Sequence, residues 1–287
     1  MLGQSWAMAF LGHQPRKRFA QHWLIDAAVL DRILDAADVQ PHDQVLEVGP
    51  GRGSLTERLL ASPAMAVHAI ELDRDLVAGL RQRFVDQPRL TLQEGDVLSV
   101  PLTFPDGTAA TKVVANIPYN ITGPLLERLV GRLDRPVEMP YQRLVLLLQK
   151  EVAERIRARP GQSCFSALSV RLQLLARCTS VCPVPPRCFK PSPKVQSEVI
   201  SLEPLEPDQR LEPLLARRVE ALLRQAFLAR RKMLRNTLAG LRPAAELNAL
   251  AQAIGISLQQ RPQELSPAHW VELARGLNRA DDVGHES

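Results

Sequence analysis

The run Val45-Leu-Glu-Val-Gly-Pro-Gly-Arg-Gly-Ser54 decides the fold of this 287-residue chain. Four residues with strand character lead into three alternating glycines and then into the helical pattern Leu55–Leu60. This is the order of a strand, a tight turn and a helix N-terminus, in which glycine lets the backbone approach a ligand. A tight turn that binds nothing is the alternative. The spacing G-x-G-x-G differs from the G-x-G-x-x-G of dinucleotide sites, so it favours a ligand without phosphate.

Further strand-like runs alternate with helical patterns after this turn. The runs are Val67–Ile70, Leu90–Leu92, Val113–Ala115 and Leu144–Leu148, and the clearest helical segment between them is Arg74–Phe84. Such alternation predicts right-handed βαβ units, and therefore a mostly parallel sheet with helices on both faces. Ligands of such α/β sheets bind at the carboxyl ends of the strands.

Two acidic residues follow predicted strands at the edge where a ligand is expected. Glu71 comes about 20 residues after the glycine turn, where a carboxylate can accept hydrogen bonds from both hydroxyls of a ribose. Asp96, in Gly95-Asp-Val97, could accept a hydrogen bond from an adenine amino group. Each acid alone is also explained as a helix cap or a turn residue. Their order at successive strand ends predicts a nucleoside pocket.

The tetrapeptide Asn116-Ile-Pro-Tyr119 follows the next strand and is suited to holding an exocyclic amine. The lone pair of an adenine N6 is delocalised into the ring, so a catalyst must accept hydrogen bonds from the amino hydrogens and hold the base. The Asn116 side-chain oxygen and the carbonyl of Ile117 or Pro118 are the candidate acceptors, and Tyr119 offers a flat face for a flipped-out base. An ordinary turn closed by Asn and Pro is the alternative.

The amino-acid composition indicates which kinds of partner the protein binds. Thirty-six Lys and Arg residues against 31 Asp and Glu residues give a net charge of +5, which favours a polyanionic partner. No apolar stretch has the length of a membrane span, and Met1–Leu11 lacks the order of charges of a secretory signal, although an organelle transit peptide is an alternative.

The four cysteines lack the paired spacing of a structural zinc site, so we expect no metal and reduced thiols in a cytoplasmic protein. They are Cys164, Cys178, Cys182 and Cys188.

A Pro-rich polar segment, Glu203–Asp208, separates the alternating pattern from a purely helical one. We therefore predict an α/β domain over residues 1–205 and a smaller all-α domain over residues 206–287. A helix predicted over Leu214–Leu238 has an apolar stripe and, on its opposite face, a row of arginines. A solvated surface is the alternative, but arginines without interleaved acids repel one another unless an anion balances them, which favours RNA phosphate contact. The arginines are Arg217, Arg224, Arg231 and Arg235.

Together these motifs resemble the ribosomal small-subunit RNA adenine N6,N6-dimethyltransferases, which are relatives of the erythromycin-resistance rRNA methyltransferases and of the Dim-type enzymes. Arg16–Leu24 resembles the basic N-terminal motif of the family, and Glu47–Gly53 resembles its S-adenosylmethionine loop. Val184–Val195 resembles the loop whose aromatic residue, here Phe189, packs against the target base. Ala226–Asn236 is more similar to the housekeeping branch, which acts on the small subunit, than to the resistance enzymes.

The resemblance implies a Rossmann-like S-adenosylmethionine-dependent methyltransferase domain with a seven-stranded sheet. The family pattern Gly-Gln-Asn-Phe is replaced here by Ala20-Gln-His-Trp23, so an imidazole takes the place of an amide and only one tautomer suits a given contact. A buried structural histidine is the alternative for His22. The implied cofactor contacts are His22, Leu24, Gly49, Glu71, Asp96 and Asn116, and the implied catalytic residues are Asn116, Pro118, Tyr119 and Phe189.

The implied reaction is the dimethylation of two adjacent adenosines in a hairpin loop near the 3′ end of 16S rRNA in a pre-30S particle. The implied enzyme is a cytoplasmic monomer that uses S-adenosylmethionine, without a metal or a membrane. One alternative is a large-subunit rRNA methyltransferase of the resistance type, and another is a non-catalytic RNA-binding assembly or transcription factor. A nicotinamide-dependent oxidoreductase fits the alternation of strands and helices but not the glycine spacing.

Overall fold

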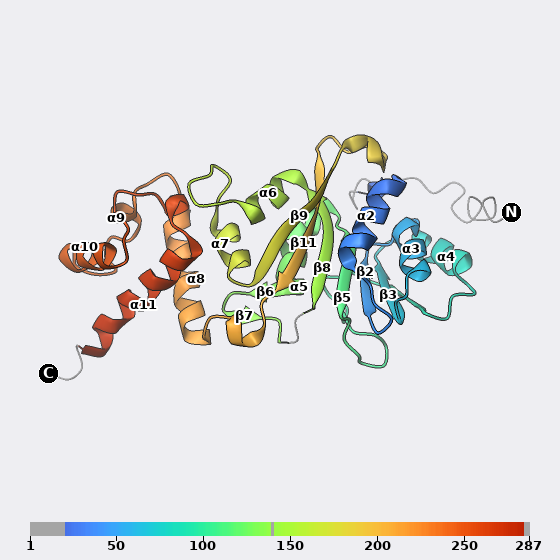
Figure 1. Ribbon diagram of the computed structural model, residues 1–287, viewed down its shortest axis with the longest axis horizontal. Coiled ribbons are helices and arrows are strands. Elements are labelled where there is room, and N and C mark those ends of the chain that lie inside the picture. The colour runs from blue at the N-terminus through green and yellow to red at the C-terminus, as the bar shows by residue number, and fades with distance from the viewer. Residues whose placement is uncertain (1–20, 139–140, 284–287) are drawn as a thin grey trace. The chain divides into compact units, whose positions relative to one another are not determined.

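The computed structural model describes residues 21–138 and 141–283, and its chain divides into two compact units (Figure 1). The sheet unit comprises residues 1–129, 139–153 and 178–204, and the helical unit comprises residues 130–138, 154–177 and 205–287. The second unit therefore includes two segments from the middle of the chain. The division into domains 1–205 and 206–287 stays a prediction, and the predictions on Met1–Leu11 and Arg16–Ala20 lie outside the described residues.

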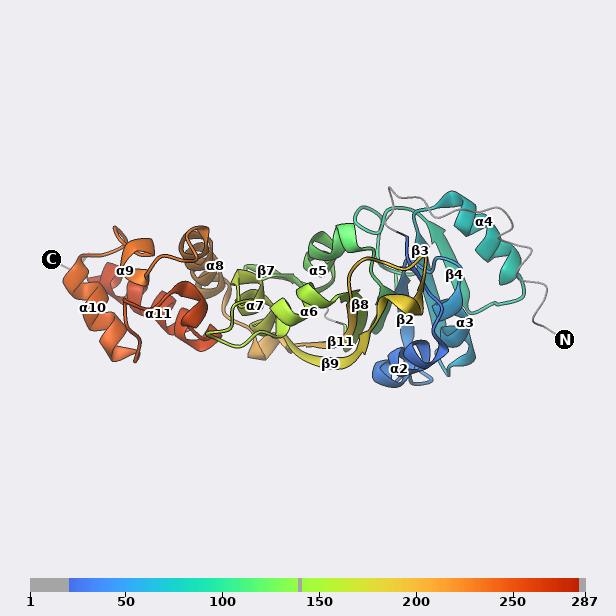
Figure 2. The ribbon, with the colours of Figure 1, turned by 90° about the horizontal axis from the view of Figure 1, so that it is seen from above.

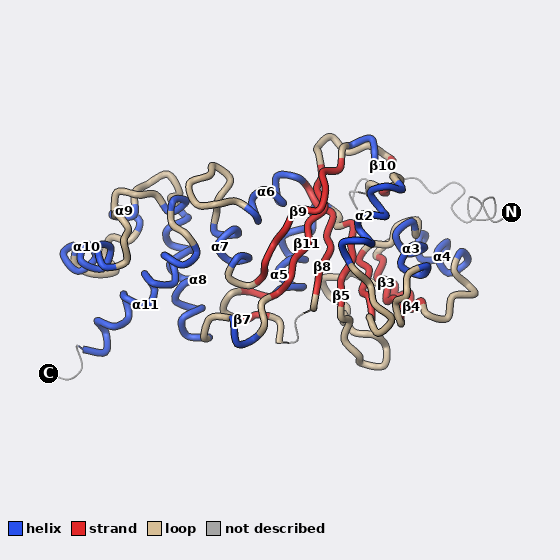
Figure 3. Tube along the Cα trace, viewed as in Figure 1, coloured by secondary structure: helices blue, strands red, loops and turns tan. Residues whose placement is uncertain are grey.

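A seven-stranded sheet, in the order β4-β3-β2-β5-β8-β11-β9, forms the centre of the sheet unit (Figures 1 and 3). All neighbouring pairs from β4 to β8 are parallel, whereas β11 is antiparallel to β8. The predicted mostly parallel sheet of seven strands is confirmed, and the five predicted runs all lie in its strands. The bounds are β2 Gln44–Val48, β3 Ala66–Glu71, β4 Leu90–Glu94, β5 Lys112–Asn116, β8 Arg143–Gln149, β9 Ala176–Val184 and β11 Ser197–Pro204.

Helices α3, α4 and α5 each connect two parallel strands, as the alternation predicts, whereas the connection from β4 to β5, which the structure describes in full, contains no helix. Helices α2 and α3 lie on the same side of the sheet (Figure 2). Their side chains Ile33 and Leu59 are fully buried in one core cluster with Val45 and Val114 of the sheet, where burial of such side chains contributes about 1.5–3 kcal/mol each. The predicted helix at Arg74 is confirmed. The bounds are α2 Ala27–Ala37, α3 Ser54–Ala61, α4 Arg74–Arg83 and α5 Thr122–Val130.

A short two-stranded sheet joins the N-terminal part of the described chain to a late loop. Strand β1 (Trp23–Leu24) pairs antiparallel with β10 (Phe189–Lys190), so that Leu24 lies opposite Phe189. Both of these side chains are buried, at 4% and 3% exposure, in the same cluster as helix α2. This pairing places His22, the residue before β1, next to the loop that follows β10.

The chain after Asp208 is helical, as predicted, over the residues that the structure describes. Trp270 is fully buried in the helical unit and lies 5.8 Å from Phe227, ring centroid to ring centroid. The buried carboxylate of Glu220 accepts two hydrogen bonds from Arg171, at 2.8 and 2.6 Å, which balance its charge. The helices and hairpin strands are β6 Gly131–Arg132, β7 Arg135–Pro136, α6 Lys150–Arg157, α7 Ala167–Gln173, α8 Pro213–Leu228, α9 Leu234–Thr237, α10 Ala244–Ala253 and α11 Pro267–Val283.

The prediction of one helix over Leu214–Leu238 is wrong. Helix α8 ends at Leu228, and Met233, which has extended backbone angles, precedes the separate helix α9. Between them, the Arg230 side chain donates hydrogen bonds to Gln263 Oε1, at 2.9 Å, and to the carbonyl of Ser163. These long-range bonds hold the turn in place of a continued helix. The arginines therefore form two pairs, Arg217 and Arg224 on α8, and Arg231 and Arg235 at the turn and on α9.

Within residues 21–138 and 141–283, no helix combines the length and the apolar character that crossing a bilayer requires.

Candidate active site

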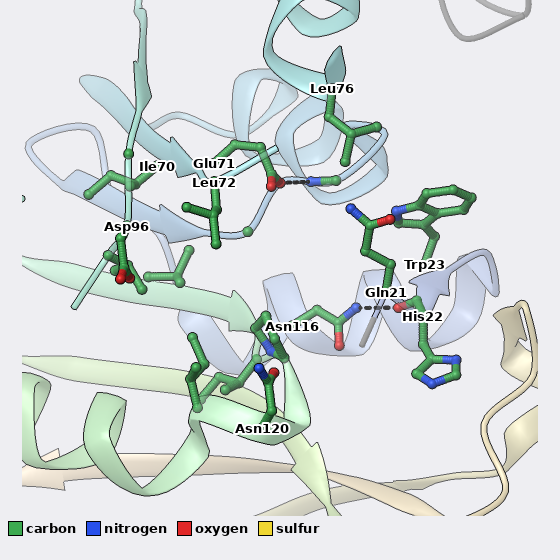
Figure 4. A pocket seen from close by; sticks show the side chains of 18 residues that line it. Gln21, His22, Trp23, Ile70, Glu71, Leu72, Leu76, Asp96, Asn116 and Asn120 are labelled. Carbon is green, nitrogen blue, oxygen red and sulfur yellow. Dashed lines mark hydrogen bonds between the residues drawn. The ribbon is translucent and has the colours of Figure 1, made fainter. Parts of the chain in front are cut away.

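A cavity of about 330 Å³ lies at the carboxyl ends of β2, β3, β4 and β5 (Figure 4). This is the edge of the sheet at which a ligand is expected, and the volume is within the usual range for small-molecule sites. Six of the residues predicted to bind a cofactor or substrate line it, namely His22, Gly49, Glu71, Asp96, Asn116 and Pro118.

The glycine turn after β2 forms one wall of the cavity. Gly49, Gly51 and Gly53 all have positive φ, at 67°, 60° and 83°. A Cβ on Gly51 would lie 2.8 Å from Cδ1 of Trp23, which is closer than van der Waals contact allows. The turn therefore depends on glycine both for its backbone conformation and for the close approach of Trp23.

Glu71 connects the end of β3 to this turn. Its Oε2 accepts a hydrogen bond from the backbone N of Gly51 at 3.0 Å, and its Oε1 accepts one from the backbone N of Asp73 at 2.9 Å (Figure 4 shows the first). Burial raises the pKa of the carboxyl, which is 7% exposed. Each carboxylate oxygen can accept a second hydrogen bond, so both can still bind the hydroxyls of a ribose.

Asp96 lies at the far end of the cavity, near Ile70 and Leu72 (Figure 4). Its Oδ1 accepts a hydrogen bond from the backbone N of Leu98 at 2.9 Å, and within the described chain no other group bonds the side chain. The second oxygen is therefore available to an amino group. Leu72 is 50% exposed and presents an apolar surface beside it, which suits the face of a flat ring.

The Asn116 side chain is held in one orientation. Its Nδ2 donates a hydrogen bond to the backbone carbonyl of His22 at 3.0 Å (Figure 4). The Oδ1 atom is thereby left as the acceptor that an amine requires. The Ile117 carbonyl is the stronger candidate for the second acceptor, because the Pro118 carbonyl already accepts a bond from the Ile121 backbone N at 3.1 Å.

The His22 imidazole makes one hydrogen bond that an amide could also make and one ring contact that an amide could not. Its Nδ1 lies 2.8 Å from the Pro191 carbonyl. Since a carbonyl only accepts, Nδ1 carries the proton, which identifies the tautomer. The ring also stacks on Tyr119, with a centroid distance of 5.6 Å and an interplanar angle of 28°. His22 is partly exposed, so it is not the buried structural histidine of the alternative.

Three predicted residues do not line the large cavity. The Tyr119 hydroxyl lies 2.6 Å from Ser197 Oγ, and burial raises its pKa. Leu24 and Phe189 are both buried in the core next to α2. The predicted arrangement, with a base between Tyr119 and Phe189, is not present here: Phe189 has no exposed face, and the ring next to Tyr119 is His22.

Other cavity residues were missed by the sequence reasoning. Leu72 had a recognisable signal, because it is an apolar residue directly after Glu71, the acid that is predicted to bind a ribose. Trp23 lies in the quoted motif Arg16–Leu24, but its contact with Arg52, whose guanidinium lies 3.9 Å above the indole ring, has no local signal. The missed lining residues include Gln21, Trp23, Ile70, Leu72, Leu76, Asn120 and Ile121.

The four arginines predicted to contact RNA, Arg217, Arg224, Arg231 and Arg235, are all exposed on the helical unit. The Arg224 guanidinium lies 4.0 Å from Glu220, a carboxylate that already binds Arg171. Among residues 21–138 and 141–283, no group of three His, Cys, Asp or Glu side chains is placed to hold a metal ion.

Glu47 is buried in β2 just before the glycine turn, and burial raises its pKa to about 8, with the nearby Glu71 carboxylate adding to the effect. An unfolded glutamate titrates near 4.5. Between these two values the folded chain holds a proton that the unfolded chain has lost, so this residue lowers stability as the pH rises.

We therefore expect Glu47→Gln to gain stability relative to the unsubstituted chain between pH 5 and pH 8, by up to about 1.4 kcal/mol per pH unit. Thermal unfolding at several pH values measures the difference. Glu94→Gln, at an exposed position at the end of β4, is the control and should show no such trend. A difference that stays constant with pH would contradict the protonated state of Glu47.

The sheet order, the glycine turn after β2 and the acids after β3 and β4 define a class of protein: the Rossmann-like S-adenosylmethionine-dependent methyltransferases. The family model for ribosomal RNA adenine dimethylase matches residues 12–279. The chain belongs to this family.

Curated relatives are similar over nearly the whole chain. "Ribosomal RNA small subunit methyltransferase A" of Prochlorococcus marinus (strain MIT 9313) is 84% identical over 279 residues, covering 97% of this chain and 100% of the relative. The protein of the same name from Synechococcus sp. (strain WH7803) is 74% identical, covering 96% and 99%.

Two solved structures share the fold over most of the chain. A dimethyladenosine transferase from Plasmodium falciparum has a TM-score of 0.75 and 28% identity, and the match covers 91% of this chain and 98% of that one. The 23S rRNA methyltransferase ErmE has a TM-score of 0.72 and 26% identity, with coverage of 89% and 99%. The fold is therefore shared with an enzyme that is named for 23S rRNA.

Proposed function

We propose that this protein transfers methyl groups to the N6 atoms of two adjacent adenosines in the hairpin loop near the 3′ end of 16S rRNA, forming N6,N6-dimethyladenosine. The orientation of Asn116 carries the proposal. Its Nδ2 is bound to the His22 carbonyl, so its oxygen is available to an amino group at the edge of a nucleoside-sized cavity.

S-adenosylmethionine, when bound, supplies an electrophilic methyl group. The cavity suits it, because the Glu71 carboxylate can accept bonds from ribose hydroxyls, Asp96 can accept one from the adenine amino group, and Gly49 gives the backbone room, with only ordinary contacts near its Cβ position. These residues would hold the cofactor.

Neutral acceptors hold the target amine. The Asn116 amide oxygen and the Ile117 carbonyl polarise N6 without removing its proton first, so alignment and polarisation supply most of the rate enhancement, and no strong general base is needed. Tyr119 offers a ring on which the target base could stack once His22 has moved aside.

The choice of substrate rests on similarity. The relatives named for the small subunit are up to 84% identical to this chain, whereas the large-subunit enzyme ErmE is 26% identical. This favours 16S rRNA in a pre-30S particle as the partner. We further propose that the protein acts in the cytoplasm as a monomer.

The proposal is tested by measuring methyl transfer from labelled S-adenosylmethionine. Unmethylated small and large ribosomal subunits are used as separate substrates. Nucleoside analysis should find N6,N6-dimethyladenosine in small subunits alone. Product in large subunits would instead indicate the resistance branch. Cofactor binding without any product would favour a non-catalytic assembly factor.

We expect neutralisation of Arg224 or Arg231 to weaken binding to small subunits and to reduce the slope of log affinity against log salt by about one unit each. Both side chains are exposed, and each would release counterions only if it contacts a phosphate. Arg275→Gln is a matched control, because this exposed guanidinium already pairs with Glu272 at 2.6 Å. An unchanged slope in Arg224→Gln and Arg231→Gln would argue against phosphate contact.

A further inference from the structure

The helical unit contains a second cavity, which the proposed methyl transfer does not use. It has a volume of about 310 Å³ and is formed by helices α8 and α11 and by the segment Leu241–Arg242 before α10. We call it the trough. Its volume falls within the usual range for sites that bind small molecules or single groups of a larger ligand.

One face of α8 and one face of α11 form the trough. Arg218, Ala221, Leu222 and Gln225 have the spacing that places four side chains on the same side of a helix. On α11, Ala274 and Leu277 are three residues apart. Leu222 and Ala274 are buried, and with Leu241 and Leu277 they give the trough an apolar floor.

The rim of the trough is cationic. Arg242 donates a hydrogen bond to the Leu277 carbonyl at 2.8 Å, which holds its guanidinium beside the cavity. Arg218 is partly buried, and no hydrogen bond or ion pair engages its guanidinium within the part of the chain that the structure describes. A partly desolvated cation next to apolar side chains has no opposite charge to balance it until an anion binds.

The neighbouring surface of α8 extends this positive charge. At 100° per residue, Arg217 and Arg224 project about 90° away from the centre of the trough face, next to Ala221 on its rim. Glu220 is the one acid within α8, and it accepts two hydrogen bonds from Arg171 and lies 4.0 Å from Arg224, so two arginines share one carboxylate. The positive charge along this edge of the trough is therefore not cancelled by the helix itself.

We propose that the trough holds an unpaired nucleotide of the RNA substrate, with the base on the apolar floor and its phosphate on Arg218. The proposal rests on the proposed function in taking RNA as the substrate. An unstacked base offers two flat faces and a polar edge, and it stacks on aromatic rings and arginine planes and, in pockets for single bases, on apolar side chains.

The polar edge of a base also has a partner in the trough. Gln225 Nε2 donates to the Thr237 carbonyl at 2.8 Å, which leaves its Oε1 as an acceptor. An apolar segment of a protein would fill the floor but would leave Arg218 without an anion. A polyanion without bases would balance Arg218 but leave the floor exposed. A nucleotide satisfies both requirements.

Two substitutions in the full-length chain test the contact with the base and the contact with the phosphate separately. Ala221→Phe, at an exposed rim position, fills the trough, and Arg218→Gln removes the cation. Affinity is measured for a fluorescent single-stranded oligoribonucleotide and for inorganic polyphosphate of similar charge. We expect Ala221→Phe to weaken RNA binding about tenfold or more and to leave polyphosphate binding unchanged, because it blocks the stacking contact. Arg218→Gln should weaken both.

The controls are Ala249→Phe, an exposed alanine on α10 that does not line the trough, and Arg275→Gln. If Ala221→Phe binds RNA as tightly as the unsubstituted chain, or if Arg218→Gln alone weakens binding, the trough does not hold a base and the proposal is wrong. If Ala221→Phe changes the oligomeric state but leaves RNA affinity unchanged, the trough binds a second copy of the chain instead of a nucleotide, and the proposal is also wrong. These affinities do not depend on methyl transfer, so they are separate from the test of dimethyladenosine formation.

Discussion

Asn116→Ala is expected to lower turnover about 100-fold to 1,000-fold at saturating S-adenosylmethionine and RNA, with little change in cofactor affinity. Removal of one preorganised hydrogen-bonding group from an active site has effects of this size. In the proposed mechanism Asn116 Oδ1 accepts a hydrogen bond from the target amine, whereas Glu71 and Asp96 would make the ribose and adenine contacts of the cofactor. Single-turnover methyl transfer to small subunits and a separate titration with S-adenosylmethionine measure the two quantities.

Asn120→Ala is the matched control for this prediction. It is also an asparagine that lines the cavity, but its side chain is exposed and it follows the strand end by four residues. We expect its turnover to stay within about threefold of the unsubstituted chain, as usual for a surface change outside the reacting groups. Turnover that is equally reduced in both variants would assign the effect to the loop and not to Asn116.

Glu71→Ala is expected to weaken S-adenosylmethionine binding about 100-fold. The variant removes the proposed acceptor for two ribose hydroxyls, and it also leaves the backbone N atoms of Gly51 and Asp73 without their buried partner. The loss of a charged hydrogen-bond partner costs about 1.5–3 kcal/mol for each bond. Calorimetric titration well below the unfolding temperature measures the affinity.

Glu94→Ala is the control for the cofactor prediction, because Glu94 lies opposite Glu71 in the sheet register but is exposed and does not line the cavity. Glu71→Gln should bind better than Glu71→Ala, since the amide oxygen keeps one acceptor. Unchanged cofactor affinity in Glu71→Ala would remove Glu71 from the ribose site.

Much of the fold could be predicted because its signals are local. Runs such as Val113–Ala115 and Leu144–Leu148 are continuous and apolar, as expected of strands buried on both faces, and glycines mark the turn after Val45–Val48. The positions of Glu71 and Asp96 follow from the same logic, since parallel strands end at one edge. These predictions needed no knowledge of long-range contacts.

The errors in the prediction come from contacts between distant residues. The pattern of arginines and apolar residues continues through Arg231 at helical spacing, and no Gly or Pro marks the end of α8. The chain turns there because Arg230 bonds Gln263 and Ser163. Likewise, the burial of Phe189 follows from its pairing with Leu24, 165 positions earlier in the chain, which no local pattern reveals.

The orientation of Asn116 has a consequence for the end of the reaction. Because one Nδ2 hydrogen is bound to the His22 carbonyl, the side chain is oriented so that Oδ1 is the acceptor for the target nitrogen. Unmodified adenine has two amino hydrogens, the monomethylated base has one, and the dimethylated base has none. The finished product therefore leaves Oδ1 facing methyl groups, and an unsatisfied acceptor of this kind costs about 1–3 kcal/mol. In the proposed mechanism, the oxygen atom that accepts hydrogen bonds from the base before each of the two transfers thus favours its departure after the second.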